Sequence, residues 1–251
     1  MSGKCYYCGK EVEKRAIKRH LKSCKSRKER IELLPCEKIK NSNYFMIEIS
    51  DKYRKSDYWL YIACHKESKL SDIDKFLRGI WVECCGHLSE FVIHGITYDC
   101  IEDEDFKLDD FYVGSEEQSM NIKLKKVFDV GTKFNYSYDF GDTTQLEGRV
   151  LDSFIYYTED KNIEIMARHN NPRYECTNCK NDAKYFSYET GPVCSKCVGE
   201  DEEYMNELGD LSSPRCGICG YSGEREDEEI YLPKVIEKQK NKHSESSAIK
   251  K

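Results

Sequence analysis

The residues of this chain best suited to chemistry are its 14 cysteines, most of which occur in Cys-x-x-Cys pairs. Closely paired thiolates bind Zn²⁺, whereas secreted proteins use cysteines for disulfides. We therefore expect the paired thiols to hold metal in a reducing, cytoplasmic setting. The first residues lack the apolar core of a signal peptide, and no apolar run approaches the ~20 residues of a membrane-spanning helix, so no membrane partner is expected.

The first candidate metal site lies within residues 5–24. After a Cys-x-x-Cys pair and eleven intervening residues come a histidine and a cysteine that lie four positions apart. Four positions are about one helical turn, so a helix would turn both later ligands towards the same ion. The stretch resembles the Cys-Cys-His-Cys zinc fingers, and its predicted ligands are Cys5, Cys8, His20 and Cys24.

The predicted helix of this finger has a basic surface. Residues 1–40 hold 13 Lys/Arg against 5 Asp/Glu, although the whole chain has a formal charge of −6. Such a surface suits phosphate groups, and binding through it would weaken as salt rises. The candidate nucleic-acid contacts are Lys14, Arg15, Lys18, Arg19 and Lys22. Contact with a protein and simple capping of the chain end are the alternatives, because one finger reads only about three base pairs.

Three further Cys-x-x-Cys pairs lie near the C-terminus. They are Cys176 with Cys179, Cys194 with Cys197, and Cys216 with Cys219. A tetrahedral zinc ion takes four thiolates, so the three pairs cannot all serve one ion. Spacing alone favours the second and third pairs, since their gap of 18 residues fits known zinc patterns better than the first gap of 14. Redox chemistry is less favoured, because no strand–helix context surrounds any pair.

A catalytic site is conceivable in the run CCGHLSEFVIHG at residues 84–95. Cys84, Cys85 and His87 could act as thiol and base, or could bind metal together with His94. We favour the interpretation that both cysteines are small buried residues at the end of a helix. Adjacent cysteine side chains diverge, and no third group that would orient a base lies nearby in the sequence.

The middle of the chain, residues 44–168, has the composition of a folded core. Residues 44–49 and 58–63 are rich in aromatic and β-branched side chains, which predicts two strands. A helix with one apolar face is expected to start at Ser71, with a capping box to Asp74.

Four aromatic residues mark the most regular strand of this region. The rings recur every second residue and belong to Phe134, Tyr136, Tyr138 and Phe140. This spacing predicts one buried aromatic face. Gly141 then predicts a tight turn and a hairpin, and we expect the acids of the turn, Asp139 and Asp142, to be exposed.

The order of these elements resembles the plasmid ORF-three-like domain family, first labelled from a root-inducing plasmid. The resemblance covers roughly residues 43–155 and rests chiefly on HLSEF at 87–91 and YDFGDTTQLEGRV at 138–150. It implies a compact α+β domain that occurs on mobile elements and has no established activity. Many members carry Trp and His soon after the second Asp, where this chain has Thr144 and Leu146.

The same resemblance bears on the C-terminal cysteines. Family members with a cysteine-rich tail carry an SPR-x-G-x-CGY segment beyond a zinc ribbon, and residues 213–221 match it. The first cysteine of that segment is not usual in the family. The resemblance therefore implies that the ribbon ligands are Cys176, Cys179, Cys194 and Cys197, with Cys216 and Cys219 as the competing pair.

Together these expectations describe an α+β protein with a central mixed sheet and one main packed helix, flanked by two small zinc modules. The expected parts are a Cys-Cys-His-Cys zinc finger at 1–30, a basic linker at 31–43, the plasmid ORF-three-like domain at 44–168, a cysteine-rich zinc-ribbon-like module at 169–232 and a disordered polar tail at 233–251. We expect two structural Zn²⁺ ions, since four protein ligands leave no open position for water.

The expected function is non-enzymatic binding, with nucleic acid as the first candidate partner and another protein as the second. The rival hypothesis is a metal-dependent enzyme acting on nucleic acid or nucleotides through the central domain. Its candidate residues are His87, Asp139, Asp142 and Glu147, which would have to converge on a divalent ion. Asp142 is equally well explained as a turn residue that bonds its own backbone.

Overall fold

A computed structural model describes residues 1–32, 43–100, 117–156, 163–187, 190–199, 206–207, 212–221, 223 and 228–233. The statements below concern these residues. Most of the predicted basic linker and nearly all of the predicted polar tail lie outside them.

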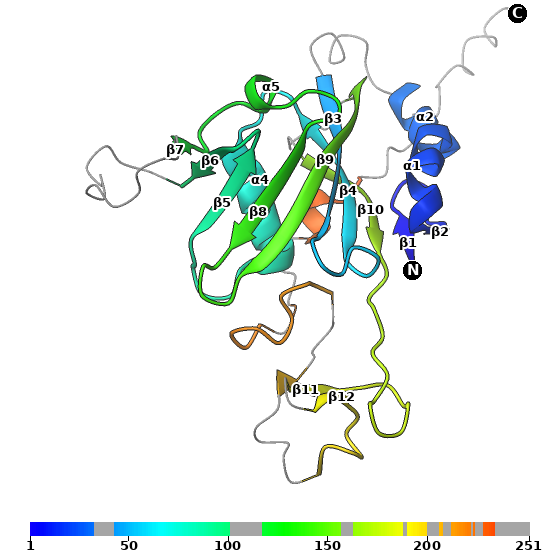
Figure 1. Cartoon of the computed structure of the whole chain (residues 1–251). Helices are drawn as coiled ribbons and strands as arrows, with labels where there is room; N and C mark the ends of the chain where they lie inside the picture. Colours follow the sequence, from blue (N-terminus) through cyan, green and yellow to red (C-terminus); the bar gives the residue numbers. More distant parts are fainter. Residues whose placement is uncertain are drawn as a thin grey trace, which may run out of the picture.

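A large mixed sheet forms the body of the protein (Figure 1), which confirms the expected α+β class. Within the described residues it has ten strands, in the spatial order β2 (Glu11–Glu13), β1 (Ser2–Cys5), β10 (Ile163–His169), β4 (Trp59–His65), β3 (Asn43–Asp51), β9 (Thr144–Ile155), β8 (Lys133–Tyr138), β5 (Ser89–Ile93), β6 (Ile96–Asp99) and β7 (Glu117–Ser119). The β6–β7 pair is parallel, and the pairs between the other neighbours are antiparallel.

One face of the sheet is covered by α4 (Leu70–Leu77), which continues into the π-helical turn η1 (Arg78–Val82). The expected capping box at Ser71 is wrong: Lys69 is the N-cap, and its backbone N–H bonds the Asp72 carboxylate at 2.8 Å. Asp74 is instead buried within the helix, where its carboxylate accepts hydrogen bonds from Tyr136 and Ser89. A short helix, α5 (Leu124–Val127), lies at the upper edge of the sheet (Figure 1).

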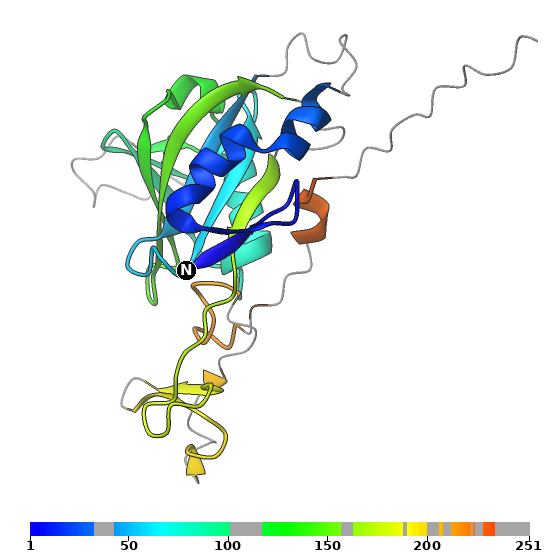
Figure 2. The ribbon, with the colours of Figure 1, turned by 90° about the vertical axis from the view of Figure 1, so that its right-hand side faces the viewer.

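The middle strands are buried on both faces, because a second helical layer covers the opposite side. This layer consists of α1 (Lys14–Ser23) and α2 (Lys25–Glu32), which lie across the sheet in Figure 2. Alternate residues of β3 and β4 therefore belong to two apolar clusters. Ile47 and Ile62 pack with α4, whereas Met46 and Tyr61 pack with the apolar face of α1.

The N-terminal segment is continuous with the central sheet. Strand β1 pairs with β10, where Gly3 lies opposite His169, and it also pairs with β2. Gly3 permits this close approach: a Cβ atom there would lie 2.1 Å from the Arg168 carbonyl oxygen and 2.5 Å from the Trp59 ring. The first cysteine-containing stretch is thus built onto an edge of the main sheet.

The predicted hairpin forms from β8 and β9, with one difference in its aromatic face. Phe134, Tyr136 and Tyr138 are buried as expected, but Phe140 is 57% exposed. Asp139 has a left-handed backbone, with φ of 65°, so the chain leaves the strand after Tyr138 and the alternation ends.

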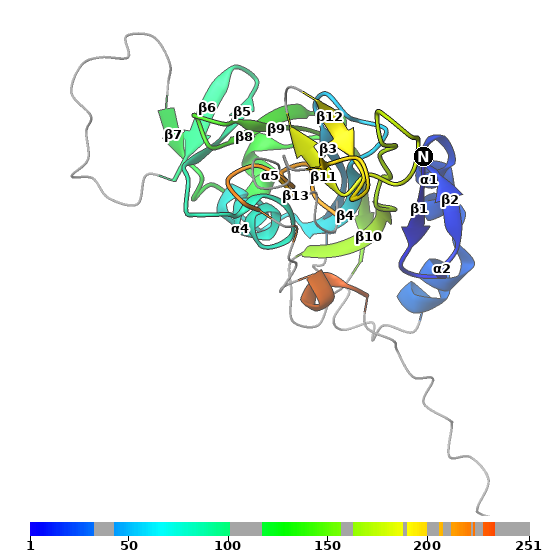
Figure 3. The same cartoon turned by 90° about the horizontal axis from the view of Figure 1, so that it is seen from below.

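The C-terminal part forms a small sheet and two separate contacts with the main body. Strands β12 (Gly191–Val193), β11 (Tyr185–Ser187) and β13 (Asn206–Glu207) form the small sheet, seen from below in Figure 3. Residues 212–221 lie between this sheet and the main body (Figure 1). The 3₁₀ helix η3 (Glu228–Tyr231) packs near β10, where Glu228 pairs with the buried Arg168.

No helix within the described ranges is both long enough and apolar enough to cross a membrane.

Candidate metal centres

The structure gathers cysteine and histidine side chains into three clusters. In each cluster the possible ligand atoms lie within 4.8 Å of one another. The clusters are Cys5, Cys8, His20 and Cys24; Cys176, Cys179, Cys194 and Cys197; and Cys84, Cys85, His87 and Cys219. Zinc bonds of about 2.3 Å to sulfur and about 2.0 Å to nitrogen place the ligand atoms of a tetrahedral site roughly 3.5–3.8 Å apart. All three clusters could therefore hold a metal ion.

The first cluster joins the β1 edge to α1. Cys5 ends β1, and a turn closed by the Gly9 N–H to the Cys5 carbonyl, at 2.8 Å, brings Cys8 beside it. His20 lies on α1, with its Nε2 3.4 Å from the Cys8 sulfur, and Cys24 follows directly after the helix. The structure thus brings together the four residues that the spacing selects.

The surroundings of this cluster are apolar. Ile17 and Leu21, on the same side of α1, are fully buried against Trp59 and Tyr61 of β4. Burial raises the pKa of the Cys5 thiol to about 12 and lowers the pKa of His20. A bound cation would offset this cost, because metal binding favours the thiolate.

The second cluster lies in the small C-terminal module. Its cysteines occupy two turns, one before β11 and one after β12, and the sulfurs of Cys179 and Cys194 are 3.5 Å apart. Burial alone would raise the pKa of Cys176, but backbone N–H groups of Cys194, Cys179 and Asn178 outweigh it and lower the pKa to about 6. A thiolate stabilised in this way is suited to metal binding.

Of the two pairings that the sequence left open, the structure brings together only the cysteines of one. The four cysteines that come together are those implied by the family resemblance, whereas spacing alone favoured the third pair. Cys219 lies beside His87 of the central domain, with its sulfur 3.9 Å from Nε2. Cys216 belongs to none of the clusters found among the described residues.

The third cluster was not predicted from the sequence. Cys84 and Cys85 follow η1, and the expectation that they are buried small residues is wrong: Cys84 is partly exposed and Cys85 is exposed. Their sulfurs converge to 3.4 Å, and the Cys85 sulfur lies 2.9 Å from His87 Nε2. The fourth member, Cys219, comes from the far end of the sequence, so no local pattern could reveal the set.

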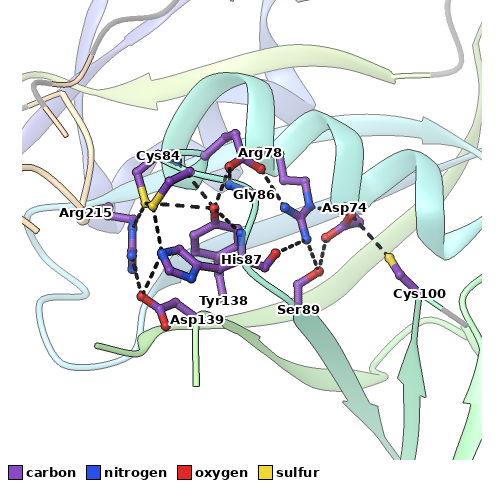
Figure 4. A network of polar contacts seen from close by, with 12 residues as sticks. Asp74, Arg78, Cys84, Gly86, His87, Ser89, Cys100, Tyr138, Asp139 and Arg215 are labelled. Carbon is purple, nitrogen blue, oxygen red and sulfur yellow. Dashed lines mark hydrogen bonds and ion pairs between the residues drawn. The ribbon is translucent and has the colours of Figure 1, made fainter. Parts of the chain in front are cut away.

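A buried arginine supports this cluster. Arg215 is fully buried, and its guanidinium donates hydrogen bonds to the Cys84 sulfur at 3.2 Å and to the Asp139 carboxylate at 2.6 Å (Figure 4). The hydrogen bond from Arg215 lowers the pKa of Asp139. Burial alone would raise the pKa of Cys84, but Arg215 and Cys85 bring it below its ordinary value.

The candidate residues of the enzyme hypothesis come together only in part. His87 Nε2 lies 3.4 Å from the Asp139 carboxylate, and Asp139 is buried, so the expectation of an exposed acid is wrong there. Asp142 is exposed, as expected, and its backbone carbonyl accepts a hydrogen bond from Arg215. Glu147 pairs with Lys55 at 2.7 Å and lines a groove elsewhere on the sheet.

The predicted nucleic-acid contacts differ in their availability. Lys14 is half-buried, 3.8 Å from Glu48, and Lys22 pairs with Asp152 at 2.7 Å. Arg15 is exposed and contacts the neighbouring Glu13. Lys18 and Arg19 are also exposed, and no ion pair involves them within the described part of the chain.

A groove of about 560 Å³ adjoins the start of α1, on the face of the sheet that α1 and α2 cover. Its lysine, arginine and carboxylate lining residues are Lys14, Lys55, Lys133, Arg149, Glu48 and Glu147. Cations therefore exceed carboxylates along this groove.

Comparison with known proteins gives little functional information. No protein-family model matches this chain, and no curated protein matches it. One similar solved structure is that of MM3350, a protein of unknown function from Methanosarcina mazei Go1. It is 19% identical, the match covers 51% of this chain and 70% of that chain, and the TM-score is 0.43. The resemblance to the plasmid ORF-three-like family stays a prediction.

Proposed function

We propose that this protein binds nucleic acid through the basic face of its N-terminal module, and that structural Zn²⁺ holds that module and the C-terminal ribbon in shape. Thiolate and imidazole ligands suit Zn²⁺, and a site with four protein ligands has no open position for a reacting water molecule. The assignment is therefore to binding rather than to catalysis.

The observation that carries this proposal is the division of α1 into two faces. The face towards the sheet and the metal cluster consists of Ile17, His20, Leu21 and Cys24. The opposite face consists of Arg15, Lys18, Arg19 and Lys22, all exposed. Both sets follow the spacing i, i+3, i+4, i+7 of a helical stripe, so four cations lie in one row about 10 Å long.

Charge and position favour a phosphate backbone as the ligand of this row. Lys25 and Lys28 of α2 are also exposed, so cations continue into the second helix. Lys14, at the start of α1, lines the groove in which cations exceed carboxylates. A row of mobile cations neutralises several phosphates and releases their counterions, which supplies affinity without sequence specificity.

The test is binding of the full chain to labelled duplex DNA, single-stranded DNA and RNA across a salt series. We expect affinity to fall steeply with salt. The variant Lys18→Glu/Arg19→Glu should lower affinity at least tenfold and reduce the magnitude of the log–log salt slope by about two.

A matched control separates a local contact from a general effect of net charge. Lys75 of α4 and Lys126 of α5 are exposed and lie outside the N-terminal module. Lys75→Glu/Lys126→Glu changes the total charge by the same amount and should leave affinity within about twofold. Equal losses in the two variants, or no binding by the wild type at low salt, would overturn the proposal in favour of a protein partner.

A further inference from the structure

The third cluster is assembled from two parts of the chain that are distant in sequence. One part is the loop after η1, which contributes Cys84, Cys85 and His87. The other is the segment 212–221, which contributes Cys219. The nitrogen and sulfur atoms that face one another are separated by 132 positions in the chain. Their convergence is therefore a property of the folded domain.

The loop that carries the first three residues is held by the hydroxyl group of Tyr138. This hydroxyl donates a hydrogen bond to Glu83 Oε1 at 2.7 Å. It also accepts the backbone N–H groups of Cys84, at 3.4 Å, and His87, at 3.3 Å. One buried side chain thus fixes the backbone on both sides of Cys85.

The segment 212–221 is also held by hydrogen bonds to the central domain. Ser212 and Ser213 are buried, and the Ser213 hydroxyl bonds the Trp81 carbonyl. Arg54 Nη2 donates to the Pro214 carbonyl at 2.6 Å. Arg215 is fully buried and reaches the hairpin turn. Cys219 is therefore placed by a docked backbone.

From these contacts we propose that Cys84, Cys85, His87 and Cys219 form a third metal site that takes Zn²⁺ and fastens the segment 212–221 to the central domain. The distances are similar to those in the two clusters predicted from the sequence. Sulfur–sulfur separation is 3.4 Å here and 3.5 Å in the ribbon cluster, and sulfur–nitrogen separations are 2.9 and 3.9 Å here and 3.4 Å in the N-terminal cluster.

Arg215 fits the charge of such a site. Three thiolates and a neutral imidazole around Zn²⁺ carry one net negative charge. The guanidinium lies 3.2 Å from the Cys84 sulfur and 3.6 Å from the Cys219 sulfur, so it can donate to both thiolates. Hydrogen bonds to metal-bound thiolates orient the ligands and stabilise their charge. Arg215 is therefore a positioning residue for the site.

The zinc content of the full chain, purified under reducing conditions, tests this site. Three clusters predict three ions per chain. Cys219→Ser and Cys85→Ser should each lower the content by one ion, and both residues are exposed, so neither change should unfold the domain. In protein reconstituted with Co²⁺, both variants should lose part of the sulfur-to-cobalt charge-transfer absorption.

The matched control is Cys216→Ser, which makes the same substitution three positions earlier. Among the described residues, Cys216 belongs to none of the three clusters, and its sulfur would lie 2.9 Å from a Cβ atom on Gly223. This variant should keep the wild-type zinc content.

Three results would overturn the proposal. One is a zinc content in Cys219→Ser that equals the wild type. Another is an equal loss of zinc in Cys216→Ser and Cys219→Ser. The third is rapid alkylation of Cys85 and Cys219 in zinc-saturated wild-type protein, which would identify a reactive thiol–imidazole pair instead. These measurements follow zinc content and thiol reactivity, so they hold whether or not the protein binds nucleic acid.

Discussion

Arg215 and Asp139 form a buried ion pair, with Nη2 and Oδ2 2.6 Å apart and side chains that are 0% and 7% exposed. Arg215 also donates to the Asp142 carbonyl at 2.9 Å and to the Thr144 hydroxyl at 3.1 Å. A buried arginine is tolerated only when its donors are used. The pair therefore fixes the segment 212–221 on the turn between β8 and β9.

Removal of Arg215 should destabilise the protein strongly. Arg215→Ala leaves Asp139 without its cation and deletes the contacts to the hairpin turn. We expect the free energy of unfolding to fall by about 3 kcal/mol, because breaking a buried ion pair leaves an uncompensated group. Urea unfolding followed by circular dichroism measures this change.

The control for that experiment is an exposed ion pair of the same type. Arg15 contacts Glu13 with side chains that are 86% and 60% exposed. Arg15→Ala should cost less than about 1 kcal/mol. A similar loss of unfolding free energy in the two variants would contradict the conclusion that Arg215 fixes the segment 212–221 on the turn between β8 and β9.

The local features of this fold could be predicted from the sequence. The ligands of the first metal cluster lie within residues 5–24, and their spacing requires only one turn and one helix. The alternation in β8 shows which rings are buried, up to the position where Asp139 takes a left-handed backbone. In such cases the residue spacing within one element is enough to predict which side chains lie together.

The long-range features could not be predicted in this way. The pairing of β1 with β10 joins two short strands from different ends of the chain. Cys219 meets His87, and Arg215 meets Asp139, because the segment 212–221 docks on the central domain. Neither contact leaves a periodic pattern in the sequence. A Cys-x-x-Cys spacing therefore suggested that Cys216 and Cys219 act as a pair, although among the described residues only Cys219 lies in a cysteine–histidine cluster.

The pH dependence of one surface ion pair follows from its pKa. A hydrogen bond from Lys22 lowers the pKa of Asp152 below its ordinary value of 3.8. A carboxylate with a lowered pKa stabilises the folded state above pH 3.8, and this contribution is lost as the pH falls through the folded-state value. Asp152→Asn should therefore lower stability by up to about 1 kcal/mol at pH 7, because the pair is partly exposed.

The difference between Asp152→Asn and the wild type should shrink as the pH falls below 3.8. Thermal unfolding of both proteins across this range measures it, and effects common to both proteins cancel. A constant difference from pH 7 to pH 3 would show that Lys22 does not perturb Asp152.

Gly148 should not tolerate a side chain. A Cβ atom at this position of β9 would lie 2.0 Å from the Phe134 ring, which stacks on Phe128 at 5.2 Å. Gly148→Ala should destabilise the protein by about 1–3 kcal/mol through overpacking. The double variant Gly148→Ala/Phe134→Leu should recover part of this loss, which a double-mutant cycle would measure as coupling.

The control for Gly148 is Gly141, where a Cβ atom would meet only an Asp139 oxygen at 3.4 Å. Gly141→Ala should change stability by less than about 0.5 kcal/mol. An equal effect at both glycines would mean that chain flexibility, and not contact with Phe134, explains the result.

Loss of metal from the first two clusters should have different consequences. Cys5 belongs to β1, which pairs with β10, and its cluster packs on Trp59 and Tyr61 of the main sheet. The second cluster has a small apolar core of its own, formed with Val193 and Val198. We therefore expect Cys8→Ser to weaken the central domain and Cys179→Ser to unfold only the ribbon. Both substituted cysteines lie at least partly at the surface, so packing losses are small.

Hydrogen exchange followed by mass spectrometry distinguishes these outcomes. In Cys8→Ser, amide protection should fall in β1, β10 and β4. Loss of the N-terminal module would expose the β10 edge of the sheet and the face that α1 covers. In Cys179→Ser, protection should fall in residues 174–187 and 190–199 and stay at the wild-type level in β3, β4 and β9. Loss of protection across the central sheet in both variants would show that the ribbon supports the main domain as well. Unchanged protection in both would show that neither cluster stabilises the fold through a bound ion.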